Sequence, residues 1–145
     1  MGGESIYKFD QVTDEEIEIF QSLSKNNTHV MLQSFLPEIY DGDFRILIIH
    51  GEVCPIALAR IPQEGSFKGN LAAGGKGIAK EISTQQKNVA KEIGKILIKN
   101  NIAFAGIDMI GNHLTEINVT SPTGAKEIFD QSGVNPIELL FNKLL

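Results

Sequence analysis

The sequence predicts an α+β fold in which antiparallel hairpins are combined with amphipathic helices. Two pairs of apolar runs, each interrupted by a short turn signal that contains glycine, indicate the hairpins. Segments with helix-capping signals stand before, between and after these runs. The 145 residues, 42% of them hydrophobic and 21% charged, are enough for one buried core and exclude a disordered chain.

The first part of the chain predicts two short strands around a helix. We expect strands over residues 5–9 and 29–36, the second of which ends at Pro37. Between them, Thr13 and Glu16 have the spacing of a capping box, in which each side chain accepts a backbone N–H of the other residue. A helix is therefore expected to begin at this point.

Three further helices are expected in the rest of the chain. One should run from residues 83–84 to about Asn100, because apolar residues recur there at helical spacing. Two short helices should follow, one from about Gly124 and one capped by Asn135 with Pro136 at its first position.

The first hairpin is expected between residues 45–49 and 53–61, with Gly51-Glu52 as its turn. Both runs are apolar at successive positions, which indicates burial on both faces. In a hairpin with a two-residue turn, the numbers of two paired residues add up to an odd number. Arg45 and Arg60 therefore lie on the same face of the sheet.

These two residues are the only arginines in the chain. A guanidinium group binds carboxylates or phosphates through two parallel hydrogen bonds, whereas lysine is the usual surface cation. The pattern predicts an anion site at Arg45 and Arg60. A structural ion pair of Arg45 with Asp41 or Asp43 explains it equally well.

The second hairpin, over residues 102–110 and 114–119, carries Asp108, Glu116 and Asn118. With a three-residue loop, Asp108 lies opposite Glu116 and all three side chains share a face. A tighter turn sends the two carboxylates to opposite faces.

The apolar residues of this hairpin favour the first register. Only that register collects Ile107, Met109, Ile117 and Val119 on the other face. Two carboxylates and an amide oxygen are ligands that suit Mg²⁺. A solvated polar strand face is the alternative interpretation.

Residues 62–77, between the two hairpins, form a glycine-rich segment that is long for an ordinary connection. Glycines allow a backbone to approach phosphates or a loop to close over a site. Lys68 and Lys76 could bring positive charge there. The alternative is a surface linker.

Charge and composition exclude some function classes. The net charge of −5 and the lack of a basic cluster argue against nucleic-acid binding. No apolar run approaches the length of a membrane span, so no membrane partner is expected. A single cysteine, Cys54, and an N-terminus without a secretory signal lead us to expect a cytoplasmic protein.

Three long strings identify a resemblance: DGDFRILI from Asp41, ARIPQEGSFKGNLAAGGKG from Ala59 and GIDMIGNHLTEINVTSPTG from Gly106. Over essentially its whole length, the chain resembles the C-terminal half of bacterial-type glutathione synthetases, a family of the ATP-grasp superfamily. The resemblance implies an ADP-forming ligase that joins γ-glutamylcysteine to glycine through an acyl phosphate. ATP would be a substrate and Mg²⁺ the cofactor, with Mn²⁺ as a possible substitute. The family tends to form homo-oligomers.

The resemblance also implies a division of the chain. Residues 1–36 would be the end of the small ATP-grasp subdomain with the adenine hinge. Residues 37–145 would be the larger catalytic subdomain, an antiparallel sheet with flanking helices, with residues 62–77 as its lid.

By resemblance, each site residue receives an expected role. The metal ligands would be Asp108, Glu116 and Asn118. ATP would be bound by Gly2, Gly3, Gln33, Ser34, Phe35, Leu36 and Asp43, the last as a ribose contact. The substrate carboxylates and transferred phosphate would be bound by Arg45, Arg60, Lys68, Gly69, Ser121, Pro122 and Thr123, and the catalytic residues would be Arg45, Arg60 and Asn70.

Two departures from the family pattern affect this expectation. Lys68 and Lys76 stand where many members have arginine, so binding there should be weaker. The chain also begins at Met1, inside the family's glycine loop over the ATP phosphates. We therefore expect a fragment that alone binds nucleotide weakly and has no ligase activity. The alternatives are another ATP-grasp carboxylate–amine ligase and a truncated, non-catalytic nucleotide-binding or assembly module.

Overall fold

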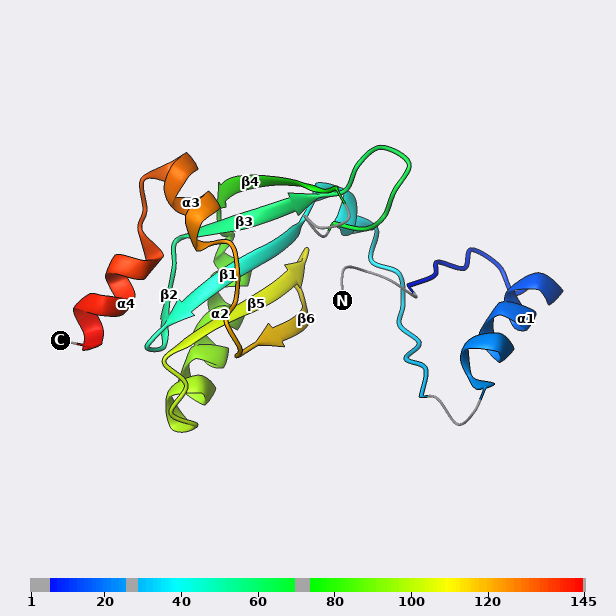
Figure 1. The fold of residues 1–145 in the computed structure, drawn as a ribbon, viewed down its shortest axis with the longest axis horizontal. Helices are drawn as coiled ribbons and strands as arrows, with labels where there is room; N and C mark the ends of the chain where they lie inside the picture. Colours follow the sequence, from blue (N-terminus) through cyan, green and yellow to red (C-terminus); the bar gives the residue numbers. More distant parts are fainter. Residues whose placement is uncertain (1–5, 26–28, 70–73, 145) are drawn as a thin grey trace. The chain divides into compact units, whose positions relative to one another are not determined.

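The computed structural model describes residues 6–25, 29–69 and 74–144 (Figure 1). The chain divides into two compact units, and the boundary between them falls between Leu36 and Pro37. Within the described residues, no helix has the length and apolar character needed to cross a membrane.

The described part of the first unit contains one helix, α1 (Asp14–Leu23), and it begins as predicted. The Thr13 backbone N–H donates to Glu16 Oε2 at 2.8 Å, and the Glu16 N–H donates to Thr13 Oγ1 at 3.4 Å. The two strands predicted on either side of it are wrong, because residues 6–9 and 29–36 form no strand. A β-strand needs a neighbouring strand for its backbone hydrogen bonds, and the described part of this unit holds none. Residue 5 lies outside the described residues.

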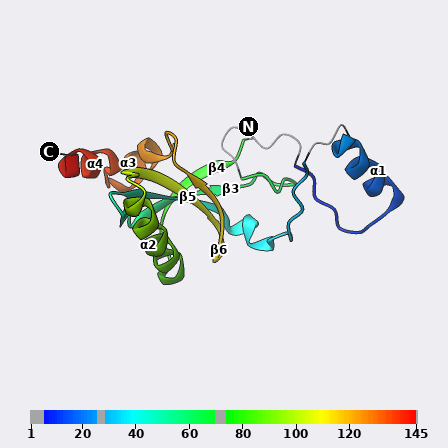
Figure 2. The same ribbon diagram turned by 90° about the horizontal axis from the view of Figure 1, so that it is seen from below.

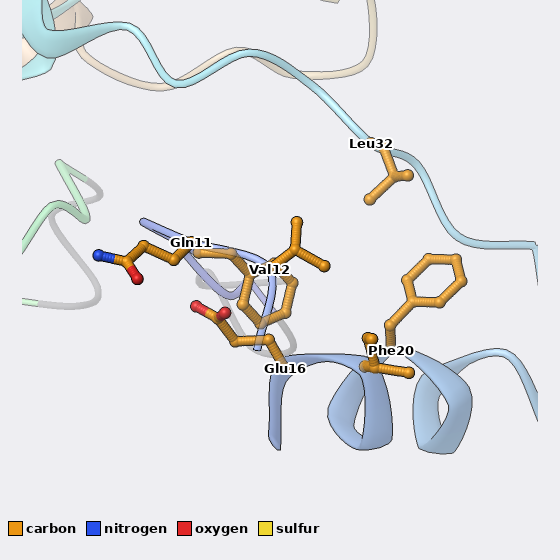
Figure 3. A pocket seen from close by; sticks show the side chains of 7 residues that line it. Gln11, Val12, Glu16, Phe20 and Leu32 are labelled. Atoms are coloured by element: carbon orange, nitrogen blue, oxygen red, sulfur yellow. The ribbon is translucent and has the colours of Figure 1, made fainter. Parts of the chain in front are cut away.

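Helix α1 leaves its apolar side chains largely uncovered. None of its residues is buried, and Val12 just ahead of it is 87% exposed. An apolar pocket of this unit lies between the helix and the segments before and after it (Figure 3). Its lining consists of Phe9, Gln11, Val12, Glu16, Ile17, Phe20 and Leu32.

The second unit is built on an antiparallel sheet with the strand order β4-β3-β1-β5-β6, and β2 adds to the end of β1. The elements follow the chain as η2 (Pro37–Asp41), β1 (Asp43–Ile49), β2 (Glu52–Val53), β3 (Ile56–Ile61), β4 (Lys76–Glu81), α2 (Thr84–Lys99), β5 (Phe104–Ile110), β6 (His113–Asn118), α3 (Ala125–Ser132) and α4 (Pro136–Leu144). The α+β class predicted from the sequence is confirmed.

Helices cover the two faces of this sheet separately (Figure 2). On one face, Ala90 and Leu97 of α2 pack with Ile46 and Ile107. On the other face, Ile128 of α3 packs with Leu47 of β1, Leu58 of β3 and Cys54. Successive side chains of a strand alternate between faces, so each central strand contributes to both layers of the core.

The predicted helices of this unit are confirmed. Ser83 and Gln86 form a capping box at the start of α2. The Asn135 side chain accepts the N–H groups of Ile137 and Glu138 at 3.1 and 3.2 Å, as expected of a cap before Pro136.

The first hairpin is buried on both faces as predicted, but its turn lies one residue earlier. Ile49 pairs with Glu52, so the turn residues are His50 and Gly51. Both have positive φ, 46° and 77°, which is the backbone conformation that a tight two-residue hairpin turn requires. Because the turn has two residues, the predicted parity of Arg45 and Arg60 is retained.

The second hairpin combines the two registers considered above. Asp108 pairs with Glu116, as the preferred register predicts, whereas Met109 pairs with Leu114. The extra residue is Thr115, which forms a β-bulge and makes the turn shorter than expected. Its hydroxyl donates to the Asp108 carbonyl at 3.1 Å.

Strand β4 is not among the predicted elements. The sequence indicates a glycine-rich segment over residues 62–77 and no strand directly after it. Its outer side is occupied by a side chain of α3. Gln131 Oε1 accepts the Ala79 N–H at 2.8 Å, and Gln131 Nε2 donates to the Gly77 carbonyl at 3.2 Å. The Gln131 amide thus replaces a neighbouring strand at this edge.

Candidate functional site

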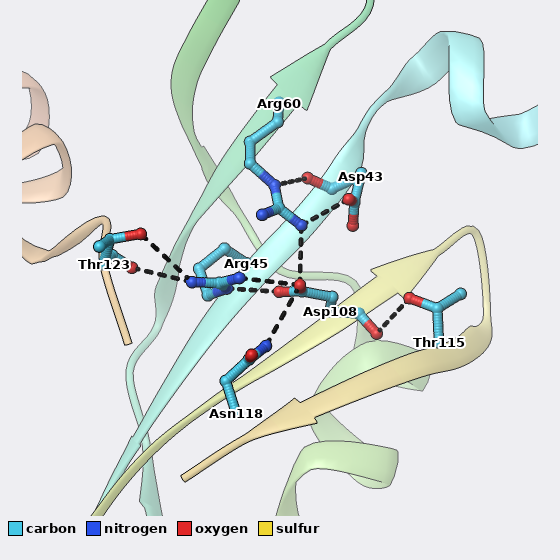
Figure 4. Close-up of polar contacts among 7 residues, drawn as sticks. All are labelled: Asp43, Arg45, Arg60, Asp108, Thr115, Asn118 and Thr123. Carbon is cyan, nitrogen blue, oxygen red and sulfur yellow. Dashed lines mark hydrogen bonds and ion pairs between the residues drawn. The ribbon is translucent and has the colours of Figure 1, made fainter. Parts of the chain in front are cut away.

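Four charged side chains meet on the face of the sheet that α3 covers (Figure 4). The register places Arg45 opposite Asp108 across β1 and β5, and Asp43 opposite Arg60 across β1 and β3. Cross-strand partners share a face, and Asp43 and Arg45 are two residues apart on one strand. Sheet pairing alone therefore brings these four side chains together, and they are called the charged cluster below.

Asp108 is the centre of the charged cluster. Arg45 donates to it from both Nε and Nη2, with Nη2 at 2.8 Å from Oδ2. Arg60 Nη2 lies 2.9 Å from the same oxygen. Asp108 is 2% exposed and each arginine 8% exposed. One carboxylate is thus bound by two guanidinium groups with little access to water.

Each arginine also has a second partner. Arg60 Nη2 forms an ion pair with the Asp43 carboxylate, and Arg60 Nε donates to the Asp43 carbonyl at 3.4 Å. Arg45 Nη1 lies 3.4 Å from both the carbonyl and the hydroxyl of Thr123. Two positive and two negative groups balance, as buried charges require. The predicted ion-pair alternative thus exists with different partners, because Arg45 pairs with Asp108 and Asp43 pairs with Arg60.

The two aspartates of the charged cluster respond to it in opposite directions. Burial by itself raises the pKa of Asp108, but hydrogen bonds and charges from Arg45 and Arg60 outweigh burial and leave this pKa lowered. Burial also raises the pKa of Asp43, and Arg60 only partly offsets it, so this pKa stays raised. Burial lowers the pKa of Arg60, yet its two carboxylate partners outweigh burial and leave it raised. The cluster therefore favours an ionised Asp108.

The predicted metal ligands lie beside the charged cluster. Glu116 is paired with Asp108 across the strands, and Asn118 Nδ2 lies 3.4 Å from Asp108 Oδ2. Glu116 is exposed, and within the described residues no ion pair involves it. The described residues contain no group of three or more His, Cys, Asp or Glu that could hold a metal. The candidate set is therefore a mixed one of two carboxylates and an amide.

This donor set fits a hard cation such as Mg²⁺, which prefers oxygen ligands and keeps several waters. Asp108 already accepts hydrogen bonds from Arg45 and Asn118 and forms an ion pair with Arg60. A cation at Asp108 would therefore have to displace at least one of these donors.

The other predicted site residues are distributed unevenly. Of residues 121–123, Thr123 contacts Arg45 of the charged cluster. Gly69 is buried against the Arg60 carbonyl. The predicted hinge residues 33–36 belong to the first unit, where the Lys8 ammonium stands 4.7 Å from the centre of the Phe35 ring. Gly2, Gly3 and Asn70 lie outside the described residues. The individual roles stay predictions.

Gly106 is a site residue that the sequence analysis missed. A Cβ atom there would lie 2.8 Å from Pro122 Cβ and 2.9 Å from Arg45 Cδ. The bare backbone of Gly106 thus lets the Arg45 side chain cross β5 toward Asp108. A glycine inside an apolar strand often marks such a close approach, and this signal was present in the sequence.

The antiparallel sheet with flanking helices is consistent with an α+β ATP-grasp domain, and comparison with family models assigns the chain to that class. The family model described as prokaryotic glutathione synthetase, ATP-grasp domain, matches residues 1–133. The chain therefore belongs to this family.

Curated relatives of the chain carry the name glutathione synthetase. The protein from Nitrosomonas europaea is 49% identical over 99% of this chain and 45% of its own length. The protein from Neisseria meningitidis serogroup A is 47% identical over 92% of this chain and 42% of its own length. That from Shewanella oneidensis is 45% identical over 99% and 46%. The chain thus spans less than half the length of the curated relatives it matches.

Proposed function

We propose that this chain is part of an ATP-dependent ligase that joins γ-glutamylcysteine to glycine. Family membership supports the ATP-grasp chemistry, and the names of the relatives support the substrates. In this chemistry ATP phosphorylates the cysteinyl carboxylate, and the glycine amine then displaces phosphate from the acyl phosphate. The substrate carboxylates, the ATP phosphates and the transferred phosphoryl group are all anionic.

The observation that carries the proposal is the pair of buried arginines on one face of the sheet. Arg45 and Arg60 are the two arginines of the chain, and each is 8% exposed. In a water-poor site, preorganised guanidinium groups stabilise the charge that develops on a transferred phosphoryl group. Their role would be to bind the substrate carboxylate and the phosphoryl group and to hold them in line.

Asp108, Glu116 and Asn118 would hold Mg²⁺ in this proposal. When bound, the ion neutralises phosphate charge and orients the phosphates for transfer. The lowered pKa of Asp108 favours this role, because a carboxylate ligand must be ionised to bind the cation.

Adenine would be bound by the segment of residues 33–36, and Lys68 and Gly69 would lie close to the substrates. An acyl phosphate needs protection from water, which a loop over the site supplies. Gly69 already packs on the strand pair that carries Arg60. A homo-oligomeric state and a cytoplasmic location stay predictions.

A chimera tests this function directly. The segment of the Nitrosomonas europaea relative that matches this chain would be replaced by this chain, since the two are 49% identical. We expect ADP release that depends on both γ-glutamylcysteine and glycine. The same chimera with R60Q should bind ATP but release much less ADP.

The controls decide between outcomes. K95Q, an exposed substitution on α2, which packs on the opposite face of the sheet, should leave ADP release unchanged. A folded chimera that releases no ADP with γ-glutamylcysteine and glycine would contradict the proposed function. ADP release with a different amine would instead indicate another carboxylate–amine ligase.

A further inference from the structure

The Asp108 carboxylate is crowded by its partners, which limits the space for a cation ligand. Its Oδ2 atom accepts hydrogen bonds from Arg45 Nη2 and Asn118 Nδ2 at 2.8 and 3.4 Å and forms an ion pair with Arg60 Nη2 at 2.9 Å. The two hydrogen bonds match the two lone pairs of this oxygen, and the Arg60 guanidinium lies against it as well. A cation bound at this oxygen must therefore displace one of these groups.

Of the two guanidinium groups, Arg60 is the one that can leave Asp108 with the smaller loss. Apart from Asp108, the polar partner of Arg45 among the described residues is the neutral Thr123, with both distances at 3.4 Å. Arg60 has a second carboxylate partner, Asp43, with which it forms an ion pair. An arginine that leaves one carboxylate and stays paired with another avoids an uncompensated buried charge.

Asp43 has a spare acceptor for this exchange. Its Oδ1 atom is buried, and in the described part of the chain it has no hydrogen-bond partner. A guanidinium can donate to both oxygens of one carboxylate. Arg60 could therefore bind Asp43 with two bonds after it releases Asp108.

The surroundings of Asp43 fix it toward Arg60. The two residues are directly opposite each other in the β1–β3 register. Gly69 packs over this pair, because a Cβ there would lie 2.8 Å from the Arg60 carbonyl oxygen and 3.2 Å from Asp43 Cβ. The Asp43 side chain is 14% exposed, so it is enclosed by the strands and the loop.

We propose that Asp43 is a positioning residue for Arg60, which keeps this guanidinium paired and aimed at the transferred phosphate while Asp108 turns to the cation. The inference rests on the proposed function. It replaces the ribose contact that the family resemblance implied for Asp43.

The first test follows the two guanidinium groups by NMR. The chain holds only Arg45 and Arg60, so its arginine Nε–H region contains two side-chain signals, which R45K and R60K assign. We expect inorganic triphosphate with Mg²⁺ to shift the Arg60 signal in the wild-type chain. In D43N the free chain should show an Arg60 Nε–H that exchanges faster with water, with the Arg45 signal nearly unchanged. An Arg60 signal indifferent to D43N would overturn the inference.

The second test separates a positioning role from a ribose contact. Dissociation constants for ATP and for inorganic triphosphate, each with excess Mg²⁺, are measured calorimetrically for the chimera described above and for its D43N variant. A positioning residue should weaken both ligands alike, by about tenfold, which is about 1.4 kcal/mol. A ribose contact should weaken ATP alone, and that result would overturn the inference.

D41N is the matched control, because it removes the same charge two residues away. Asp41 is exposed and forms no ion pair among the described residues. It should change neither constant by more than about twofold. In an R60Q background, D43N should have no further effect on triphosphate. If D43N fails to fold, D43E takes its place, with an equal loss for both ligands expected. Failure of the chimera to bind either ligand would overturn the proposed function together with this inference, whereas equal binding of triphosphate by the chimera with and without D43N would overturn the inference alone.

Discussion

The two hairpins of the second unit contribute to one site, but they differ in burial. The hairpin of β1 and β3 is buried over most of its length and carries both arginines. In the hairpin of β5 and β6, β5 is equally buried, whereas five of the six residues of β6 are exposed. The cationic half of the candidate site is therefore fixed by the core, and the outer part of the proposed metal-ligand set lies on a strand open to solvent.

This difference separates two kinds of functional residue. Arg45, Arg60 and Asp108 are part of the packing, so a change in any of them alters the stability of the fold as well as the chemistry. Glu116 and Asn118 sit where the core does not depend on them. Substitutions on β6 can therefore probe ligand binding with little effect on folding.

The largest effect is expected from D108A. Removing this carboxylate leaves two buried guanidinium groups short of a partner, which should lower the free energy of unfolding by about 3–5 kcal/mol. Urea unfolding followed by circular dichroism measures the change. E116A on the partner strand is the control and should stay within about 0.5 kcal/mol of wild type. Equal losses in both variants would remove the distinction between the hairpins.

G106A should have the next largest effect. Its new Cβ would lie 2.9 Å from Arg45 Cδ and 2.8 Å from Pro122 Cβ, so either the arginine or the loop must move. We expect a loss of about 1–3 kcal/mol in unfolding experiments, as for other overpacked sites. The Arg45 Nε–H signal should shift more than that of Arg60. An unchanged Arg45 signal would show that the close approach across β5 does not restrain this side chain.

E116Q tests the exposed half of the site. With ATP present, the affinity for Mn²⁺ should fall at least by the roughly tenfold loss that follows removal of an outer-shell partner. Electron paramagnetic resonance of free Mn²⁺ measures this affinity. Thermal unfolding without metal should be unchanged, because Glu116 is exposed. E138Q, which changes an exposed carboxylate on α4, is the control, and a metal affinity equal in E116Q and E138Q would exclude Glu116 as a ligand.

The smallest effect concerns Cys54, which packs with the core beside α3. Burial raises the pKa of its thiol, so the unfolded chain loses this proton at a lower pH than the folded chain. The resulting stabilisation is complete below the ordinary thiol pKa and is lost as the pH rises through the raised value. The stability difference between wild type and C54A should therefore shrink in alkaline solution. Chemical unfolding at several pH values measures it, and a constant difference would contradict the burial effect.

Parts of this fold were predictable because their signals are local. Capping boxes begin α1 and α2 as expected, and alternation of apolar residues correctly placed Asp108 opposite Glu116. The predicted strands of the first unit failed, because extended, apolar sequence forms a strand only beside a partner. The bulge at Thr115 also escaped prediction, since both registers satisfy part of the apolar pattern.

The charged cluster was predictable only in outline. The alternation of side chains along paired strands placed Arg45 and Arg60 on one face. Which carboxylates pair with them depends on the order of the strands in the sheet, and no local sequence pattern encodes that order. Asp43 lies on β1 and Asp108 on β5, and these two strands become neighbours only in the folded sheet. Gly106 carried a readable signal, a glycine within an apolar strand, whose meaning appeared only when Arg45 was found beside it.

The amide of Gln131 has a consequence for assembly. By bonding to Ala79 and Gly77, it uses backbone groups of β4 that would otherwise recruit a foreign strand. At the opposite edge of the sheet, no side chain of the described residues binds the backbone of β6 in this way. A partner that extends this sheet by β-augmentation would therefore meet less obstruction at β6, directly next to the residues proposed to hold the metal.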